Sequence, residues 1–384
     1  MHLEQIETPA FVLDVAKVEE NCRLLAHVAE KAECKVLLAL KGFAPWSLFP
    51  LMRGYLSGVT SSGIHEALLG AEEFGGEVHV YSPGFNRREL ERLLPVANHF
   101  SFNSIAQLDI FRELWKSLPP KQQALYGKKY LGIRVNHGYS EVEVEIYNPC
   151  AKGSRLGALP EHLQNADLSG ISGLHFHTLC EQNSDTLERT IPHFEKHFGH
   201  LLPQMQWVNF GGGHHITRKD YDVERLIRII RDFRARWGVE VYLEPGEAAG
   251  LGTGVLVASV RDIVENGPQI AILDVSATAH MPDTLEMPYR PEIAGAAEPE
   301  VHPYTYRLGG PTCLAGDVIG DYSFPQPLKV GDKLVFLDMG HYTMVKTTTF
   351  NGVPLPDIAL WHPLEERYEV VRRYGYDDYK MRLS

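Results

Sequence analysis

Lys41 ends a strongly apolar run in the segment LLALKGF. A lysine at a strand end can run its aliphatic stem through the protein interior and present its nitrogen where the strand stops. Burial at such a place lowers the pKa of the ammonium group, and the neutral amine is a nucleophile that can form a Schiff base with an aldehyde. Taken alone, the same position also fits a lysine that extends from the strand end into water.

Three consecutive glycines, Gly211, Gly212 and Gly213, follow a second β-like run in the segment NFGGGHH. Because glycine has no Cβ atom, backbone N–H groups in such a segment can approach an anion closely. We therefore expect a phosphate site here, although an ordinary tight turn explains three glycines equally well.

Carboxylates and histidines end two further β-like runs. Glu244 in YLEPGEA can point from a strand end toward a ligand and hold a proton on a heterocyclic nitrogen, and Glu247 lies in the same turn. His175 and His177 in GLHFHT are two residues apart, so a strand would place both on one face, where one can stack on a flat cofactor ring. Each residue alone also fits a salt bridge or a core hydrogen bond. Because these histidines lack HxxxH spacing, we expect no metal site.

Cys313 lies in GGPTCLAGD, a segment rich in glycine and proline. A thiol in an irregular loop can donate a proton or act as a nucleophile, although most cysteines are inert packing residues. The cysteines are odd in number and have no CxxC spacing, which disfavours a disulfide framework and a zinc site. They are Cys22, Cys34, Cys150, Cys180 and Cys313.

The composition is that of a globular protein of 384 residues, with 44% hydrophobic and 22% charged residues. Its 37 basic and 49 acidic side chains give a net charge of −12, which disfavours nucleic acid as a partner and suits a cationic ligand. No apolar run is long enough for a membrane span, and MHLEQIETPAF does not have the pattern of a signal peptide. We therefore expect a cytoplasmic protein that does not enter a membrane.

Short β-like runs alternate with amphipathic stretches such as SIAQLDIFRELWKSL and DVERLIRIIRDFRARWG, as in βα units with a parallel sheet. Eight strands over this length predict a (β/α)8 barrel, in which the carboxyl ends of all strands meet at one face and carry the chemistry. The predicted strands are Lys35 to Lys41, Gly58 to Ser61, Val78 to Ser82, Phe100 to Asn103, Tyr130 to Val135, Gly173 to His177, Val208 to Phe210 and Val239 to Glu244.

After Gly250 the sequence becomes rich in Gly, Pro and Thr, and helical periodicity mostly disappears. The segments GTGVLVASVRDIV, QIAILDVSATA, KVGDKLVFLDMG and TMVKTTTFNG predict strands of a mainly antiparallel β domain, to which TPAFVLD near the start can add another strand. The predicted domains are a barrel over residues 26–250 and a β domain formed by residues 1–25 and 251–384.

This layout and these motifs together resemble the fold-type III pyridoxal-phosphate decarboxylases, the group of ornithine, arginine and diaminopimelate decarboxylases, with alanine racemase as a more distant relative. The resemblance spans nearly the whole chain. It implies pyridoxal 5′-phosphate as cofactor, Lys41 as its Schiff-base lysine, His177 as the histidine that stacks on the pyridine ring and Glu244 as the acid that bonds the ring nitrogen. Arg134 in GIRVN resembles a supporting barrel arginine.

The resemblance further implies that Gly211, Gly212 and Gly213, together with Tyr342 in GHYTM, hold the phosphate. Cys313 in GPTC resembles a cysteine that the family contributes from the second subunit, so the resemblance implies a homodimer with shared active sites. In the mechanism that we expect, Lys41 or Cys313 returns a proton to the substrate carbon that has lost carbon dioxide.

Departures from the family pattern carry information about the substrate. Leu314 follows Cys313 where decarboxylases of ornithine and diaminopimelate have an acid, so a distal amine must be recognised elsewhere. Glu247 after EPG, and Asp283 or Glu286 in MPDTLEMPYRP, offer other anionic contacts.

These segments, with HTLCEQN and NFGGGHHI, resemble the carboxynorspermidine/carboxyspermidine decarboxylase branch of the family, which belongs to polyamine biosynthesis and whose substrates are polycationic amino acids. Diaminopimelate or another basic amino acid is the alternative substrate. The alternative that is not an enzyme is a non-catalytic pyridoxal-phosphate carrier, and the segment after Gly250 disfavours it.

Overall fold

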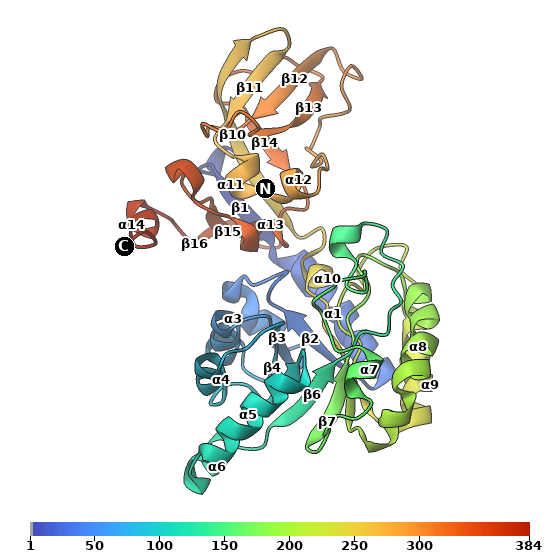
Figure 1. The fold of residues 1–384 in the computed structure, drawn as a ribbon. Coiled ribbons are helices and arrows are strands. Elements are labelled where there is room, and N and C mark those ends of the chain that lie inside the picture. Colours follow the sequence, from blue (N-terminus) through green and yellow to red (C-terminus); the bar gives the residue numbers. More distant parts are fainter. Residues whose placement is uncertain (1–2) are drawn as a thin grey trace. The chain divides into compact units, whose positions relative to one another are not determined.

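The computed structural model describes residues 3–384, which form two compact units (Figure 1). One unit consists of Glu20–Ala249, and the other of the chain up to Glu19 together with Gly250–Ser384. The predicted domain boundary at residues 25/26 falls inside the first long helix, α1 (Val15–Ala32), and the boundary at 250/251 falls at the end of the short helix α10 (Glu247–Gly250).

The barrel unit is a closed ring of parallel strands in sequence order from β2 to β9. All of the predicted barrel strands are confirmed, with ends that differ by at most two residues, and so is the (β/α)8 fold. The strands are β2 (Lys35–Ala39), β3 (Gly58–Ser61), β4 (Glu77–Tyr81), β5 (His99–Phe102), β6 (Tyr130–Arg134), β7 (Ile171–His175), β8 (Trp207–Asn209) and β9 (Glu240–Leu243).

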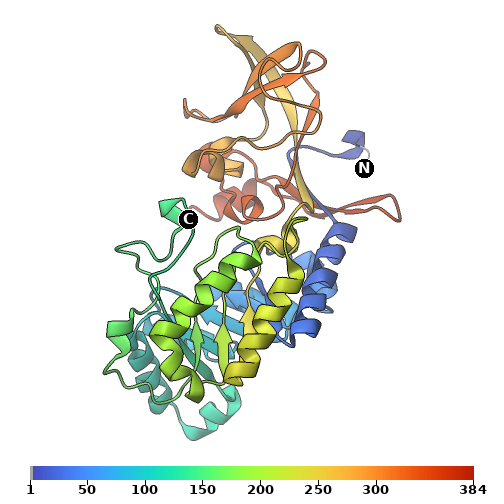
Figure 2. The same cartoon turned by 90° about the vertical axis from the view of Figure 1, so that its right-hand side faces the viewer.

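Helices surround the barrel strands, and Figure 2 shows α8 and α9 side by side on the outside of the barrel. The helices after α1 are α2 (Phe49–Met52), α3 (Ile64–Leu69), α4 (Arg87–Leu93), α5 (Ile105–Ser117), α6 (Pro120–Tyr126), α7 (Pro160–Leu163), α8 (Ser184–Phe198) and α9 (Val223–Trp237).

Helix α9 illustrates how the sequence specifies this outer layer. Its start is capped by the Asp222 carboxylate, which accepts a hydrogen bond from the Arg225 N–H at 2.9 Å. Its end is marked by Gly238, whose φ of 66° is in the left-handed region. The apolar residues at helical spacing are buried, and among them the ring of Phe233 lies 5.0 Å from that of Phe210, which directly follows β8. The helix is therefore fixed to the strand end that carries the glycine segment.

The barrel interior is filled in part by the Trp207 indole, for which two glycines provide room. A Cβ atom on Gly173 would lie 2.0 Å from Trp207 Cε2, and one on Gly132 would lie 2.4 Å from Trp207 Cη2. The indole N–H donates to Ser172 Oγ at 3.2 Å. The glycines on β6 and β7 are thus required by packing rather than by a turn.

The other unit is built around a mixed sheet with the order β13-β12-β11-β10-β1-β15-β16, in which β14 also pairs with β10. Most neighbours are antiparallel, as predicted, while β1 with β15 and β11 with β12 are parallel. The predicted strand near the start is β1. The strands are β1 (Ala10–Asp14), β10 (Gly254–Glu265), β11 (Gln269–Leu273), β12 (Tyr304–Gly309), β13 (Val318–Phe324), β14 (Lys333–Phe336), β15 (Asp357–His362) and β16 (Arg367–Arg372).

The prediction of a strand in TMVKTTTFNG is wrong, because this segment forms helix α13 (Thr343–Lys346) and a 3-10 turn at Phe350–Gly352. Its β-branched residues favour a strand locally, but the Thr347 hydroxyl donates back to the Thr343 carbonyl at 2.9 Å. The Thr348 N–H also donates to the Ala279 carbonyl at 2.7 Å, so contacts within the folded unit override the local propensity. The other helices of this unit are α11 (Ala277–His280), α12 (Asp283–Glu286) and α14 (Tyr376–Lys380).

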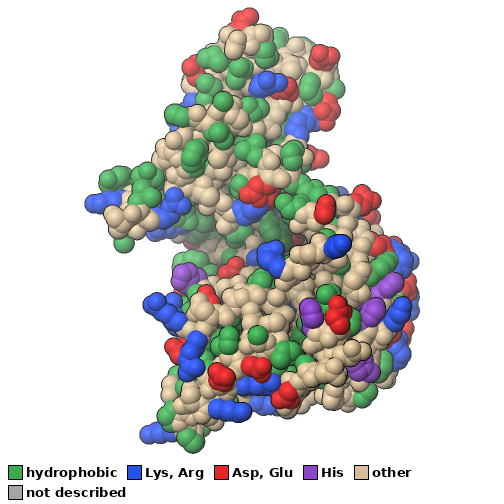
Figure 3. Space-filling view, in the orientation of Figure 1, with side chains coloured by type: hydrophobic (Ala, Val, Ile, Leu, Met, Phe, Trp, Pro, Cys, Tyr) green, Lys and Arg blue, Asp and Glu red, His purple; other side chains and the backbone are tan. Residues whose placement is uncertain are grey.

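Acidic and basic side chains are interspersed on the face of the molecule that Figure 3 shows. No helix in the described part of the chain is both long and apolar enough to span a membrane.

Replacing Gly173 by Ala should lower the free energy of unfolding by about 1–3 kcal/mol, because the new methyl group collides with a rigid indole in a filled interior. Urea unfolding followed by circular dichroism measures this change. The matched control is Gly84→Ala, where the nearest heavy atom to the new Cβ is 3.7 Å away. Equal stability of the Gly173 and Gly84 variants would contradict the packing argument.

Candidate active site

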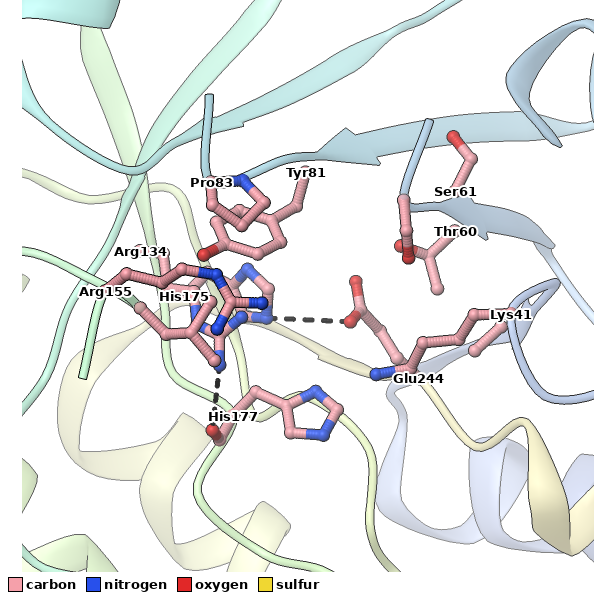
Figure 4. Close-up of a pocket in the computed structure, with 13 residues that line it drawn as sticks. Lys41, Thr60, Ser61, Tyr81, Pro83, Arg134, Arg155, His175, His177 and Glu244 are labelled. Carbon is pink, nitrogen blue, oxygen red and sulfur yellow. Dashed lines mark hydrogen bonds and ion pairs between the residues drawn. The ribbon is translucent and has the colours of Figure 1, made fainter. Parts of the chain in front are cut away.

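A cavity of about 230 Å³ lies where the carboxyl ends of the barrel strands meet (Figure 4). Lys41 follows β2, Tyr81 and Arg134 are the last residues of β4 and β6, His175 ends β7, and Glu244 follows β9. The parallel barrel therefore brings together side chains that lie far apart in the sequence. The lining residues are Ala39, Lys41, Thr60, Ser61, Ser62, Tyr81, Pro83, Arg134, Arg155, Leu156, His175, His177 and Glu244.

Lys41 points into this cavity toward Glu244 in Figure 4. Its side chain is accessible from the cavity but enclosed by surrounding protein, and this burial lowers the pKa of its ammonium group. The Arg134 guanidinium lowers that pKa further, while the Glu244 carboxylate opposes the shift. The neutral, nucleophilic amine is therefore easier to form than on a lysine in water.

Glu244 is a buried carboxylate that the site keeps ionised. Burial alone would raise its pKa, but His175, His79 and hydrogen bonds outweigh this effect and hold the pKa below its usual value. Its Oε1 accepts a hydrogen bond from Asn209 Nδ2 at 2.7 Å, and its Oε2 lies 3.5 Å from His175 Nε2. The cavity thus contains a fixed negative charge that can hold a proton on a ligand nitrogen.

His177 and His175 differ in their surroundings. Nδ1 of His177 accepts a hydrogen bond from the Gly212 N–H at 3.2 Å, which sets the orientation of the ring. Burial, followed by the charges of Lys41 and Arg134, holds the pKa of His177 well below its ordinary value. The ring nitrogens of His175 have no hydrogen-bond partner within residues 3–384, and burial lowers the pKa of His175 to about 4. Both rings are therefore neutral at physiological pH.

Arg134 and Tyr81 brace the side of the cavity. The Arg134 guanidinium lies over the Tyr81 ring, 4.5 Å from its centroid, and donates to the His177 carbonyl oxygen at 3.1 Å. The Tyr81 ring meets the His175 ring edge-on at 5.6 Å, and its hydroxyl donates to Asn103 Oδ1 at 2.8 Å. Arg134 thus fixes the loop that carries His177.

The glycine segment packs directly behind His177 and Glu244. A Cβ atom on Gly211 would lie 2.6 Å from His177 Cβ, one on Gly212 would lie 2.6 Å from the Glu244 carbonyl oxygen, and one on Gly213 would lie 2.0 Å from the Leu179 carbonyl oxygen. Gly211 and Gly213 also have φ values of 71° and 81°. Larger residues are excluded here by neighbouring protein atoms, and the Gly211 N–H donates to Asn209 Oδ1 at 2.8 Å.

Glu247 lies in the turn after β9, as predicted from EPGEA, and its Oε2 is 3.0 Å from His215 Nε2. Asp283 and Glu286 belong to α12 in the other unit, where both carboxylates bind the same ammonium group. Lys346 Nζ contacts Asp283 Oδ1 and lies 2.5 Å from Glu286 Oε2. The three predicted substrate carboxylates are thus each next to a basic side chain of their own unit.

Cys313 is exposed on a loop that Asp317 organises. The Asp317 carboxylate accepts hydrogen bonds from the Thr312 hydroxyl at 2.7 Å and from the Ser276 hydroxyl at 2.9 Å. Asn351 Oδ1 accepts a hydrogen bond from the Cys313 N–H at 2.7 Å, and the next side chain, Leu314, is also exposed. The loop therefore presents its thiol outward from a fixed backbone.

Tyr342 immediately precedes α13 and has a φ of 45°, which is unusual for a residue with a side chain. Backbone conformations of this strained kind cluster at active sites and at segments that clamp a ligand.

Sequence reasoning missed several residues that line the cavity. Tyr81, Ser61 and Ser62 follow the same strand-end rule as Lys41 and could have been found by applying it to every strand. Arg155 lies in an irregular segment between β6 and α7, so no strand-end signal marks it.

Ligand atoms of His175, His177 and Glu244 lie within 4.8 Å of one another, an arrangement that could also hold a metal ion, so the absence of a metal stays a prediction.

Residues 11–340 match the family described as pyridoxal-dependent decarboxylase, C-terminal sheet domain. The chain belongs to this pyridoxal-dependent decarboxylase family. The decarboxylase is 47% identical to a carboxynorspermidine/carboxyspermidine decarboxylase of Campylobacter jejuni, with 100% of both chains covered. It is 46% identical to a carboxyaminopropylagmatine decarboxylase of Synechocystis, with 100% of this chain and 97% of the relative covered.

Among solved structures, carboxynorspermidine decarboxylase from Campylobacter jejuni complexed with norspermidine has a TM-score of 0.89 at 46% identity and covers 98% of this decarboxylase and 100% of its own chain. Diaminopimelate decarboxylase from Helicobacter pylori has a TM-score of 0.80 at 16% identity, with 99% and 98% covered, and shows the shared fold. The predicted barrel-plus-sheet architecture and the predicted family are both confirmed.

The cofactor of the decarboxylase is pyridoxal phosphate, and the barrel cavity suits it. An amine, an ionised carboxylate and a neutral imidazole line one cavity. These are the groups that an aldehyde, a pyridine nitrogen and a flat ring require.

Acid should destabilise the decarboxylase in part through His175. Because the folded state lowers the pKa of His175 to about 4 from 6.5, the unfolded chain binds more protons between these pH values, and stability is lost as pH falls through them. Replacing His175 by Asn should remove up to about 1.4 kcal/mol per pH unit from the slope of unfolding free energy against pH.

Urea unfolding at several pH values measures that slope, with His27→Asn as the control because His27 is exposed on α1. If the His175 variant keeps the slope of the parent chain, the buried ring is not a source of acid sensitivity.

Proposed function

We propose that the decarboxylase removes the carboxyl group of carboxynorspermidine and carboxyspermidine, giving norspermidine and spermidine. The observation that carries this proposal is the cavity of Lys41, His177, Arg134 and Glu244 in a chain that is 47% identical, over its full length, to a relative with this named activity. The resemblance to the norspermidine complex from Campylobacter jejuni supports the same substrate class.

In this proposal Lys41 would hold the cofactor covalently through its amine. When bound, the cofactor would supply an acceptor for the electron pair left on the substrate carbon after carbon dioxide leaves. Glu244 would hold a proton on the ring nitrogen, which its buried negative charge favours. His177 would pack on the ring face, and the glycine segment Gly211 to Gly213 together with Tyr342 would hold the phosphate.

Arg134 acts in this scheme as a positioning residue, because it holds the carbonyl of His177 and its charge helps to lower the pKa of Lys41. A lysine with a lowered pKa is more often neutral, so it is better suited both to attack and to accept a proton near pH 7.

Recognition of the substrate is assigned to carboxylates because its distal groups are cationic. Leu314 is apolar and cannot bind an ammonium group. Asp283 and Glu286 already hold the ammonium of Lys346, so they have the geometry to bind a cation of that size. Glu247 beside His215 is the third candidate.

The Synechocystis relative gives a second candidate substrate, carboxyaminopropylagmatine, which has a guanidinium group where a triamine has a terminal ammonium. Its 46% identity over the whole chain nearly equals that of the first relative, and this is the observation that favours it. A planar guanidinium and a compact ammonium need different carboxylate arrangements, so one enzyme should prefer one of them clearly.

A product assay should show this preference. The purified, cofactor-loaded chain is incubated separately with carboxynorspermidine, carboxyspermidine, carboxyaminopropylagmatine and meso-diaminopimelate, and products are identified by mass. We expect norspermidine and spermidine, with kcat/KM values that differ by at most about 10–200-fold, because the substrates differ by one methylene, worth about 1–3 kcal/mol in a pocket. The proposed substrate is wrong if kcat/KM is highest for carboxyaminopropylagmatine or for diaminopimelate. The Lys41→Ala variant, which has no anchor for the cofactor, is the blank.

We also propose a homodimer in which Cys313 of one subunit reaches the barrel cavity of the other and helps to return the proton to the substrate carbon. The exposed thiol on a braced loop supports this role. Lys41→Ala should be inactive and Cys313→Ala impaired. Mixing the two variants should then raise the activity above the mean of the two, because half of the dimers are hybrids whose one intact site alone supplies about a quarter of the parental activity.

The mixture is unfolded and refolded together, and its kcat is compared with those of each variant alone. Activity equal to the mean of the two variants would show that each site is built from a single chain. Sedimentation of the parent chain as a monomer would lead to the same conclusion.

A further inference from the structure

Asn209 is a buried polar residue that contacts Glu244 without lining the cavity. It is the last residue of β8, and its backbone belongs to the barrel, where it is paired with His175 on β7 and with Tyr242 on β9. Any effect of its side chain on a bound ligand must therefore be transmitted by a neighbouring residue.

The Asn209 side chain makes two hydrogen bonds of opposite kinds. Its Nδ2 donates to Glu244 Oε1 at 2.7 Å, and its Oδ1 accepts from the Gly211 N–H at 2.8 Å. A backbone N–H can only donate and an ionised carboxylate can only accept, so these two partners fix which end of the amide is which. An ionised aspartate could accept from Gly211 but could not donate to Glu244, and a leucine could do neither. An amide serves both partners at once.

The backbone closes a ring around this amide. The Glu244 N–H donates to the Gly211 carbonyl oxygen at 2.8 Å, so Gly211 is linked to Glu244 both directly and through Asn209. The adjacent Gly212 N–H donates to His177 Nδ1 at 3.2 Å. The glycine segment is thus bonded to both the carboxylate and the imidazole that line the cavity, and it couples their orientations.

The buried position of Glu244 makes a hydrogen-bond donor at this point important. An ionised carboxylate is costly to bury unless hydrogen bonds satisfy it. Burial raises the pKa of Glu244, but neighbouring histidines and hydrogen bonds, including the one from Asn209, hold it below its usual value. The charged or titratable side chains around Glu244 come from four other strands or their ends, and they are Lys41, His79, Arg134 and His175.

We propose that Asn209 is a positioning residue of the decarboxylase, whose amide fixes the Glu244 carboxylate against the glycine segment and keeps it charged. This inference rests on the role proposed above for Glu244, which is to hold a proton on the cofactor ring nitrogen. A rotated or protonated Glu244 cannot hold that proton, so Asn209 acts on turnover through Glu244. Its loss should lower kcat more than it raises KM.

The first test follows urea unfolding of the full-length chain after removal of the cofactor, at several pH values. In Asn209→Asp two carboxylates meet across the 2.7 Å contact, where both cannot be ionised, so one of them keeps its proton. Above about pH 4.5 the folded variant then binds more protons than the unfolded chain, and stability is lost as pH rises. Relative to the parent, the ratio of folded to unfolded chain should fall by up to about tenfold per pH unit.

The matched variant combines Asn209→Asp with Glu244→Gln, which exchanges the carboxylate and the amide. The new amide can donate to the new carboxylate, and the Gly211 N–H keeps its acceptor, so the extra pH dependence of stability should disappear. Turnover should stay low in this double variant, because the negative charge is no longer at position 244.

The second test uses the cofactor-loaded enzyme and measures kcat and KM against pH. Asn209→Ala should lower kcat by about tenfold or more and change KM less, and the acid limb of the kcat profile should move up by about one pH unit, because Glu244 acts only when ionised. The control is Asn136→Ala. Asn136 Oδ1 also accepts from the N–H two residues on, that of Gly138, at 2.9 Å, but its Nδ2 donates to the Pro149 carbonyl. Its pH profile should follow that of the parent.

The inference is overturned if Asn209→Asp keeps the parental pH dependence of stability, or if that variant and the double variant show the same altered dependence. An unchanged pH profile in Asn209→Ala would overturn it as well, and this profile decides if Asn209→Asp does not fold. If Glu244→Gln alone keeps parental turnover, the role proposed for Glu244 is wrong, and the unfolding data still decide whether Asn209 holds the carboxylate.

Discussion

The site depends on keeping a carboxylate ionised inside a nearly closed space. An isolated buried charge is costly, and Glu244 stays ionised because Asn209 and Thr60 hydrogen-bond to it and because His175 and His79 lie near it. Its negative charge in turn favours the protonated form of Lys41, against burial and Arg134, which act in the opposite direction. One end of the barrel therefore holds opposed charges close together. Glu244, Lys41 and Arg134 each come from the end of a different strand.

Much of this arrangement could be predicted from the sequence, because short apolar runs in a regular alternation with amphipathic stretches specify a barrel, and a barrel specifies where strand ends meet. Lys41, His175 and Glu244 were identified on that basis. Arg155 could not be, since it enters the cavity from an irregular segment whose path depends on tertiary contacts. The helical turn at Thr343–Lys346 was missed for a related reason, because the carbonyl that receives the Thr348 N–H is about seventy residues away in the sequence.

The pairing of Asp283 and Glu286 with Lys346 also could not be predicted, because nothing in the sequence links α12 to α13. What the sequence indicated was an excess of carboxylates suited to a polycation; what the structure adds is that two of them already share one ammonium group. The roles of these residues, and the cytoplasmic location of the protein, stay predictions.

The crowding around Gly211, Gly212 and Gly213 limits which residues this part of the barrel can carry. Neighbouring backbone or side-chain atoms leave no room for a side chain at any of the three positions, so amino-acid substitutions in this part of the barrel are strongly constrained. The exposed loop around Cys313 and Leu314 has no such restriction at its surface. Side-chain exchanges at these two exposed positions therefore meet no steric barrier of the kind that closes the glycine positions, so the loop can vary in sequence while the packing of the barrel end stays fixed.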